Sequence, residues 1–224
     1  MEIKTVDLTK VYHIGSSEIT AVNKVSFEVN EAKFIAIVGP SGSGKSTLLN
    51  LVGLNDYPTS GKIFVNNVDA SSISSNERRK IRLLHMGFVF QTFNLLPTLN
   101  ALENVELPMA LIAKSQKEQR EKAVRLLEAV GLGSRLFHRP KELSMGEMQR
   151  VAIARALANN PEIITADEPT GQLDSKTSKE IIALLFDINR TEKTAVVVAT
   201  HDEKLVNSAD TIYTIQDGRL RFEG

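Results

Sequence analysis

The sequence predicts an α/β domain with a largely parallel sheet. Mainly apolar runs, typical of strands buried on both faces, occur at "FIAIVG" (34–39), "EIITAD" (162–167) and "TAVVVAT" (194–200). Segments with helical periodicity lie between these runs. Strands that alternate with helices are typical of parallel sheets. A length of 224 residues suits one such domain, so we predict that residues 1–224 fold as a single domain.

The remaining strand signals are shorter. "VSFEV" (25–29) alternates apolar and polar residues as a half-buried strand does, and "MGFVFQ" (86–91) is typical of another buried strand. "KIFVNNVDA" (62–70) predicts a hairpin that turns at Asn66-Asn67. The final stretch "TIYTIQDGRLRFEG" (211–224) predicts two short strands around an Asp-Gly turn.

Helical segments follow from apolar periodicity and start signals. One of them opens at Ser115 with Glu118 three residues later, which is the spacing of a capping box. No strand pattern occurs from about residue 92 to 160, so this stretch is predicted to be a mostly helical insertion. A helix is predicted at residues 115–130 within this insertion, and two more are predicted outside it at residues 45–52 and 175–189.

The charge balance argues against a nucleic-acid partner. Lysine plus arginine and aspartate plus glutamate each number 27, so there is no net basic field to collect a polyanion. No cysteine is present, which excludes disulfides and suits a reducing compartment. The N-terminal stretch lacks the apolar core of a signal peptide, and no run of about 18 apolar residues occurs. We therefore expect a cytoplasmic protein that reaches a membrane only through a partner.

The stretch "GPSGSGKST" (39–47) matches the phosphate-loop pattern G-x-x-x-x-G-K-[ST], between a buried strand and a helix. Its glycines let backbone N–H groups turn inward around phosphate oxygens. Lys45 can reach the β- and γ-phosphates, and the Ser46 hydroxyl can ligate Mg²⁺. We therefore predict a nucleotide site formed by Gly39, Pro40, Ser41, Gly42, Ser43, Gly44, Lys45, Ser46 and Thr47.

A second motif, "IITADEPT" (163–170), ends a buried strand in two carboxylates. Asp167 at the strand tip can hold Mg²⁺ through water, and Glu168 can polarise an attacking water. Pro169 is expected to keep Glu168 extended, because proline disfavours the helical region for the residue before it. The alternative is that these are two solvated acids in a turn, and the sequence leaves it open for Glu168.

The stretch "KELSMGEMQRVAIARAL" (141–157) predicts a helix with a capping box, because Ser144 is a favourable N-cap and Glu147 follows three residues later. Gly146 is unusual in a first turn, since glycine weakens a helix by about 1 kcal/mol relative to alanine. A helix N-terminus beside a glycine is also suited to hold a phosphate. Two interpretations stay open, a cap alone or a cap that also binds a phosphate.

In this order, the phosphate loop, "ITADE" and "LSMGEMQR" resemble the motifs of the nucleotide-binding subunit of ABC transporters, and the resemblance covers essentially the whole chain. It implies a P-loop NTPase (RecA-like) core, an antiparallel β subdomain and a helical subdomain at about 92–160. It also implies an ATPase that uses ATP and Mg²⁺ and forms an ATP-dependent homodimer. Each ATP is then held between the phosphate loop of one copy and Ser144 and Gly146 of the other. Met145 and Glu147 depart from the usual Leu-Ser-Gly-Gly-Gln.

The resemblance implies roles for residues outside these motifs. Tyr12 would stack on adenine, Gln91 would reach Mg²⁺ and the attacking water, and His201 would contact the γ-phosphate. The expected catalytic residues are thus Glu168, His201 and Gln91, and the expected metal ligands are Ser46, Gln91 and Asp167.

Within the family, "FVFQTFNLLPTLNALENVELPM" (88–109) and "ADEPTGQLD" resemble the macrolide-export and lipoprotein-release type. This implies an integral-membrane permease as partner and a peripheral position on the cytoplasmic face of the membrane. The basic stretch "ERRKIR" (77–82) is expected to be a solvated helix face. Apolar residues of the first stretch either form a surface for the partner or pack inside the insertion: Phe93, Leu95, Leu96, Leu99 and Leu102.

A second interpretation uses the same residues. The chain would then be an ATP-gated interaction module, as in cell-division relatives, whose dimerisation signals to a membrane partner without moving a substrate. A neighbouring gene for a periplasmic adaptor or for lipoprotein sorting would favour transport. The transported substrate itself is not encoded here, because the permease contacts it.

Overall fold

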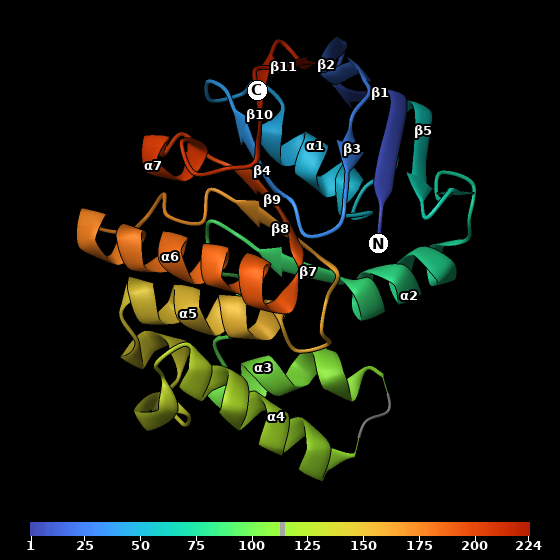
Figure 1. Ribbon diagram of the computed structural model, residues 1–224. Helices are drawn as coiled ribbons and strands as arrows, with labels where there is room; N and C mark the ends of the chain where they lie inside the picture. The colour runs from blue at the N-terminus through green and yellow to red at the C-terminus, as the bar shows by residue number, and fades with distance from the viewer. Residues whose placement is uncertain (113–114) are drawn as a thin grey trace.

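The computed structural model describes residues 1–112 and 115–224 and shows two sheets with helices packed around them (Figure 1). In this described part, the larger sheet has the order β11-β10-β4-β9-β8-β7, and all its neighbours are parallel except the β10–β11 pair. The predicted, largely parallel sheet is confirmed. Its strands are β4 (Phe34–Val38), β7 (Met86–Val89), β8 (Ile163–Asp167), β9 (Ala195–Ala199), β10 (Thr211–Gln216) and β11 (Arg219–Phe222).

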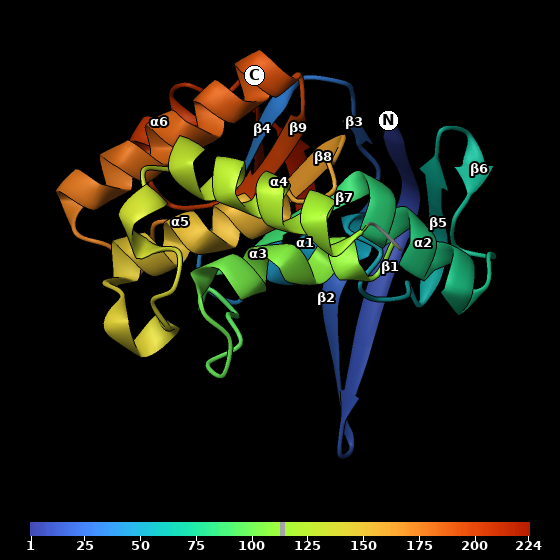
Figure 2. The same cartoon turned by 90° about the horizontal axis from the view of Figure 1, so that it is seen from below.

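The smaller sheet is antiparallel, as the resemblance implies. It has the order β2-β1-β5-β6, and β3 also pairs with β1. The far end of the β1–β2 hairpin projects from the body of the molecule (Figure 2). Its strands are β1 (Ile3–Ile14), β2 (Ser17–Val25), β3 (Glu28–Val29), β5 (Ser60–Val65) and β6 (Val68–Asp69).

Both predicted hairpin turns are confirmed. Asn66 and Asn67 have φ values of +47° and +65° between β5 and β6. Asp217 and Gly218 have φ values of +50° and +73° between β10 and β11. Two successive positive φ values match the twist of the flanking strands, and Asn, Asp and Gly reach this region at low cost.

The predicted strand "VSFEV" is not one strand. Val25 ends β2 opposite Leu8, and only Glu28–Val29 forms β3, opposite the start of β1. Between them the Phe27 N–H donates to the Thr5 hydroxyl at 2.9 Å. Because a side chain rather than a backbone carbonyl accepts this bond, the regular backbone pairing with β1 is interrupted between β2 and β3.

The predicted helices are present with similar bounds. Four of the observed helices begin with a capping box, and the two boxes predicted at Ser115 and Ser144 are among them. Between residues 92 and 160 the described residues form helices and no strand. The helices are α1 (Lys45–Val52), α2 (Ser75–His85), α3 (Ala101–Ala110), α4 (Gln116–Ala129), α5 (Met145–Ala156), α6 (Ser175–Glu192) and α7 (Glu203–Val206), with short 3₁₀ turns η1 (Gly133–Arg135) and η2 (Pro140–Glu142).

The larger sheet is buried on both faces. One face shares a core with α1 and the antiparallel sheet, through residues such as Ile37, Leu48 and Leu8. The other face packs on α5 and α6 (Figure 1), through residues such as Val198 and Ile181. Helices α3, α4 and α5 enclose a third apolar cluster of their own. Burial on both faces explains why the strands are mainly apolar rather than alternating.

The apolar residues after β7 divide between the two roles left open by the sequence. Phe93 and Leu102 are buried, so they pack inside the helical part. Leu96 is 43% exposed and remains available at the surface. Leu95 and Leu99 are half-buried.

The expectation of a solvated basic face on α2 is wrong for Arg78, whose side chain is fully buried. Its guanidinium donates to the carbonyls of Ala70 (3.1 Å) and Asp56, and it lies 4.0 Å from the Tyr57 ring centroid. Arg79, its neighbour on the helix, is exposed. Arg78 therefore anchors α2 to the segments before and after β5 and β6.

Within the described residues, no helix has both the length and the apolar character needed to cross a bilayer.

Replacing Arg78 with methionine should destabilise the fold by about 2–4 kcal/mol, because two buried carbonyls lose a charged donor. Urea unfolding measures this change. Arg79→Met on the same helix is the control and should stay within about 0.5 kcal/mol of wild type. Equal effects of the two substitutions would contradict the anchoring role.

Candidate functional site

The carboxyl ends of three neighbouring strands bring the predicted site residues together. Asp167 on β8 pairs in register with Ala199 on β9, and Ala199 pairs with Ile37 on β4. The phosphate loop follows β4, Glu168 follows β8, and His201 follows β9. In a parallel sheet these ends meet at one edge, which is where ligands bind in open α/β folds.

The phosphate loop packs too tightly against neighbouring backbone to carry side chains at two glycines. A Cβ on Gly44 would lie 2.0 Å from the Ala21 carbonyl oxygen, and a Cβ on Gly39 would lie 2.2 Å from the Ile215 carbonyl oxygen. Gly44 also has a φ of +108°. Glycine is therefore required to close the loop over β2 and β10.

The Lys45 ammonium is buried inside this loop. Its Nζ donates to the carbonyls of Gly39 (2.7 Å) and Pro40 (3.0 Å). The Ser43 hydroxyl is also buried and has no hydrogen-bond partner. Helix α1 begins at Lys45 without a side-chain cap, because Gly44 is its N-cap. A helix N-terminus with uncapped N–H groups is suited to an anion.

Two carboxylates lie beside the loop. Burial raises the pKa of Asp167, the neighbouring Glu168 carboxylate adds to this, and a hydrogen bond from Ser46 opposes it. The Oδ1 atom of Asp167 is buried without a partner. Glu168 Oε1 lies 3.9 Å from Lys45 Nζ. Its Oε2 lies 2.9 Å from His201 Nδ1, an approach that lacks hydrogen-bond geometry and is an ion pair only when His201 is protonated.

The backbone of Glu168 is left-handed, with a φ of +44°, so the expected extended conformation is wrong. The Glu168 N–H donates to the Ala199 carbonyl at 2.9 Å, and its carbonyl accepts from Gly171 N–H at 3.0 Å. These two bonds override the preference set by Pro169. A left-handed conformation costs a residue with a side chain about 1–2 kcal/mol, and such strain gathers at functional sites.

Gln91 reaches the same turn from β7. Its Nε2 lies only 3.2 Å from the position of a Cβ on Gly171. The structure therefore brings Gln91 beside the turn that begins at Glu168. Asp174, at the end of this turn, caps α6, because its Oδ1 accepts from the N–H groups of Lys176 (2.9 Å) and Thr177 (3.0 Å).

Tyr12 lies on β1 near the end of the phosphate loop. Burial raises its pKa, which a hydrogen bond with Thr47 partly offsets. Its hydroxyl donates to Asp56 at 3.0 Å, and the Lys10 ammonium lies 5.0 Å from its ring centroid. Sequence reasoning missed Lys10 and Asp56. Lys10 and Tyr12 are two residues apart on one strand face, and this spacing could have indicated that Lys10 lies beside Tyr12. No pattern in the nearby sequence indicates that Asp56 contacts Tyr12.

The first turn of α5 forms the predicted capping box. The Ser144 hydroxyl accepts from Glu147 N–H (3.2 Å), and Ser144 N–H donates to Glu147 Oε2 (2.8 Å). Arg135 Nε donates to Glu147 Oε1 at 3.1 Å. The hydrogen bonds from Ser144 and Arg135 lower the pKa of the Glu147 carboxyl. The side chain therefore stays ionised, paired and turned back onto the cap.

Gly146 has a packing role in this turn, because a Cβ there would lie 2.5 Å from Cγ2 of Thr177 on α6. Among the described residues, no hydrogen bond or ion pair joins Ser144 or Gly146 to the phosphate loop, Asp167 or Glu168 of the same chain. The two predicted halves of the phosphate site are therefore not bonded to each other among the described residues of one copy.

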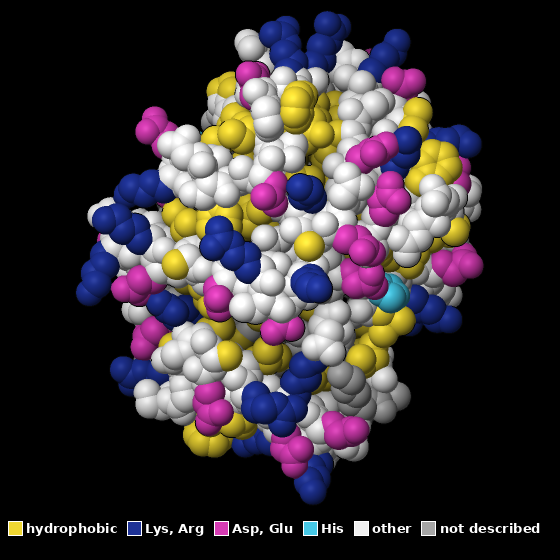
Figure 3. Space-filling view, viewed as in Figure 1, with side chains coloured by type: hydrophobic (Ala, Val, Ile, Leu, Met, Phe, Trp, Pro, Cys, Tyr) yellow, Lys and Arg dark blue, Asp and Glu magenta, His cyan; other side chains and the backbone are white. Residues whose placement is uncertain are grey.

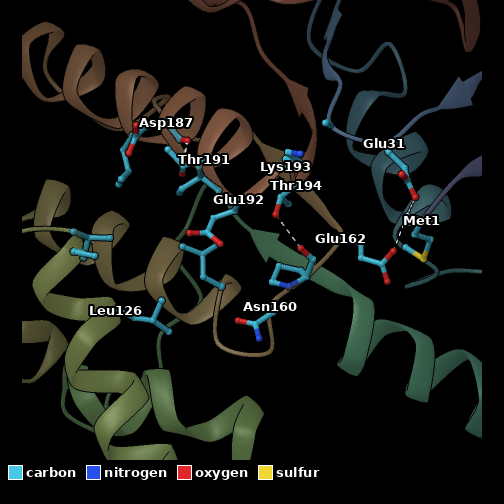
Figure 4. Close-up of a pocket in the computed structure, with 17 residues that line it drawn as sticks. Met1, Glu31, Leu126, Asn160, Glu162, Asp187, Thr191, Glu192, Lys193 and Thr194 are labelled. Atoms are coloured by element: carbon cyan, nitrogen blue, oxygen red, sulfur yellow. Dashed lines mark hydrogen bonds and ion pairs between the residues drawn. The ribbon is translucent and has the colours of Figure 1, made fainter.

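Two hollows border different ends of the larger sheet. One, of about 540 Å³, is lined by Gly39, His201 and residues of α7, beside the phosphate loop. The other, of about 510 Å³, lies where β8 and β9 begin, with Glu162, Thr194 and Leu126 in its wall (Figure 4). The second hollow contains none of the predicted site residues. On the face shown in Figure 3, acidic and basic side chains are interspersed, in keeping with the balanced composition.

Comparison with known proteins gives concordant matches. Residues 22–171 match the family described as ABC transporter. The chain is 50% identical over 218 residues to an uncharacterized ABC transporter ATP-binding protein of Thermotoga maritima, covering 97% of this chain and 93% of the relative. It is 45% identical to the lipoprotein-releasing system ATP-binding protein LolD of Legionella pneumophila, covering 95% and 94%.

Two further matches are a relative much longer than this chain and a solved structure. The macrolide export ATP-binding/permease protein MacB of Rhodopirellula baltica is 44% identical over 96% of this chain but only 32% of MacB. The solved dimeric structure of the ATP-binding cassette MJ0796 of Methanocaldococcus jannaschii, in a post-hydrolysis state bound to ADP and Pi, has a TM-score of 0.92 and 45% identity, covering 99% and 97% of the two chains. A match over most of the chain, which includes the phosphate loop and both carboxylates, shows that the chain belongs to the ABC transporter family as an ATP-binding ATPase cassette.

Proposed function

We propose that this chain is the ATP-hydrolysing subunit of an ABC transporter, that it dimerises around two ATP molecules, and that it drives a separate membrane permease. The observation that carries the proposal is the convergence of Lys45, Asp167, Glu168 and His201 at the carboxyl ends of β4, β8 and β9. Relatives described as lipoprotein-releasing and macrolide-export proteins favour transport over signalling without transport.

The loop residues bind and orient the ATP phosphates. Backbone N–H groups of the loop and of the first turn of α1 face the phosphates, and Lys45 exchanges its loop carbonyls for phosphate oxygens. Tyr12 stacks on adenine with one ring face, while Lys10 lies over the ring. The Asp56 hydrogen bond fixes the orientation of the Tyr12 ring.

The residues present fit Mg²⁺. Asp167 offers a buried, unpartnered carboxylate oxygen, and it lies beside the Ser46 hydroxyl. Gln91 approaches from the other side of the turn at Glu168. Mg²⁺ bound to ATP takes most of its oxygen ligands from phosphate and water, so few protein ligands are needed. Bound Mg²⁺ would neutralise charge on the β- and γ-phosphates.

Glu168 is positioned to act on the attacking water. Its left-handed backbone, fixed by the Ala199 and Gly171 bonds, directs the carboxylate to the space between Lys45 and His201. There it can accept a proton from water as the water attacks the γ-phosphate. His201, whose side chain is 75% exposed, can contact that phosphate from the far side.

The second half of each ATP site comes from a facing copy. No hydrogen bond or ion pair of the described residues joins Ser144 or Gly146 to the phosphate loop of their own chain, and the similar cassette MJ0796 is solved as a dimer. Glu147 does not obstruct a phosphate there, because its charge is turned back to the cap and paired with Arg135. The cap and phosphate interpretations of this turn are therefore compatible.

The permease docks in a groove between α2, β7 and α3. This groove, of about 340 Å³, is lined by apolar side chains that include Phe88, Phe90 and Leu107. Leu111 at its edge is 65% exposed. An exposed apolar groove marks a contact surface. Docking there holds the chain at the cytoplasmic face of the membrane and moves the helical part at about residues 92–160 as a unit.

Glu168→Gln should reduce ATP turnover by roughly 10²–10⁴-fold, because a positioned proton acceptor is lost while the phosphate contacts remain. Steady-state phosphate release measures turnover, and calorimetry measures ATP affinity, which should stay near that of wild type. Turnover close to wild type would exclude Glu168 as the residue that activates water.

Asp167→Asn should abolish ATP hydrolysis and yet stabilise the protein in the absence of nucleotide. Burial raises the pKa of Asp167, so the native state holds its proton more tightly than the unfolded state. The stability of wild type relative to this variant therefore falls as pH rises from the ordinary aspartate pKa of 3.8 through the raised native value. Urea unfolding from about pH 4 to 8 tests the trend, and Asp187→Asn on the exposed face of α6 is the control. A stability difference independent of pH would contradict burial of an ionisable Asp167.

Ser144→Arg should leave ATP binding by monomers near normal, because their own phosphate loop is unchanged. The bulky cation should block the facing copy's γ-phosphate, so the ATP-induced dimer and hydrolysis should both be lost. Light scattering in a Glu168→Gln background measures the dimer. Glu147→Gln is the matched control and should change dimerisation little, since the carboxylate already faces the cap. If Ser144→Arg still dimerised, this turn would be only a helix cap.

A further inference from the structure

The last turn of α5 is bonded to the segment that follows Gln91. Arg155 Nη2 donates to the Phe93 carbonyl at 2.8 Å, and Arg155 Nη1 donates to the Asn94 carbonyl. The planar guanidinium can satisfy two adjacent carbonyls at once, which a lysine ammonium on a flexible stem does less well. Helix α5 lies between α6 and the α3–α4 pair (Figure 1), so this contact ties the helical part to the end of β7.

The two carbonyls belong to a strained turn. Phe93 and Asn94 have φ values of +61° and +48°, and neither is glycine. The left-handed conformation costs about 1–2 kcal/mol at Phe93 and less at Asn94, because asparagine adopts it more readily, so the turn persists only where surrounding contacts impose it. Local contacts are burial of the Phe93 side chain, backbone hydrogen bonds from Phe93 N–H to the Phe90 carbonyl (3.1 Å) and from Asn94 N–H to the Thr92 carbonyl (2.6 Å), and a 2.9 Å hydrogen bond from the Thr92 hydroxyl to Asn94 Oδ1. Arg155 supplies the contacts from outside the turn.

We propose that Arg155 is a positioning residue for Gln91. By fixing the carbonyls of Phe93 and Asn94, it sets the direction in which the chain leaves β7. It thereby holds the Gln91 amide beside the turn at Glu168. This inference rests on the proposed ATPase function of that site, and it deepens it by linking catalysis to α5.

The link has a mechanical consequence. Ser144 caps the first turn of α5 and Arg155 lies in its last turn. A helix transmits a rigid displacement along its axis, because every turn is hydrogen-bonded to the next. Arg155 also lines the proposed docking groove between α2, β7 and α3. A displacement of α5 could therefore begin at its first turn or at this groove. In both cases the two Arg155 hydrogen bonds would pass it to the segment that follows Gln91.

The test compares Arg155→Met with Arg150→Met. Arg150 lies on the same helix and also makes two bonds, to the Val130 carbonyl (3.1 Å) and Glu180 (2.8 Å), but neither partner belongs to the Gln91 segment. Arg155→Met should lower kcat about tenfold or more with little change in KM, since small displacements of a catalytic group cost rate rather than binding. Arg150→Met should keep kcat within about twofold of wild type. Equal kcat losses in both variants would overturn the proposal.

Two further measurements separate positioning from general damage. In a Gln91→Ala background, Arg155→Met should add no further loss of kcat, because Arg155 acts through Gln91. An additive loss would overturn the proposal. Hydrogen–deuterium exchange of residues 92–95 should accelerate in Arg155→Met, partly in Arg155→Lys, and not in Arg150→Met. Unchanged exchange would likewise overturn it. A wild-type protein without ATP hydrolysis would contradict the proposed function instead, and the exchange measurement would still decide whether Arg155 fixes this turn.

Discussion

The parallel pairing of β4, β9 and β8 determines where every chemically active group of the site lies. Because Ile37, Ala199 and Asp167 are in register, the three loops that leave these strands begin side by side. One loop carries the backbone cradle and Lys45, the second carries the two carboxylates, and the third carries His201. The loop after β4 can close over the sheet only because Gly39 and Gly44 leave room for the carbonyls of Ile215 and Ala21. Strand register and two missing side chains thus bring Lys45, both carboxylates and His201 together at one edge of the sheet.

Features set by short-range chemistry could be predicted from the sequence. The buried strands, the hairpin turns at Asn66-Asn67 and Asp217-Gly218, and the capping boxes at Ser115 and Ser144 all depend on neighbours within a few residues. Features set by distant partners could not. The left-handed Glu168 depends on a bond to β9, and the buried Arg78 depends on carbonyls before and after the β5–β6 hairpin. The β1–β2 hairpin was missed because its exposed strands carry many polar residues among the apolar ones.

The first turn of α5 shows how a motif can change while its geometry is kept. Glu147 brings a negative charge to a position where the family has glutamine. However, one of its carboxylate oxygens accepts the Ser144 N–H of the capping box, and the other accepts a hydrogen bond from Arg135. The pair is partly exposed and contributes little to stability, so its effect is on the local potential rather than on the fold. Gly146 is constrained independently by Thr177 of α6, which places the first turn of α5 against the helix capped by Asp174. The turn that we propose to face a phosphate of the other copy is therefore held by contacts within its own chain.

Left-handed backbone occurs at Glu168 and in the segment just after Gln91, and a different element holds each of the two. Glu168 is held left-handed by the Ala199 carbonyl of β9, while Phe93 and Asn94 are held by Arg155 of α5. Relaxation of the backbone at Glu168 or at Phe93 would release about 1–2 kcal/mol and would move a proposed catalytic side chain. On the proposals made above, the larger sheet controls the position of Glu168 and the helical part controls the position of Gln91. Gln91 and Glu168 both border Gly171, so the proposed action of both on one water depends on the alignment of the two parts.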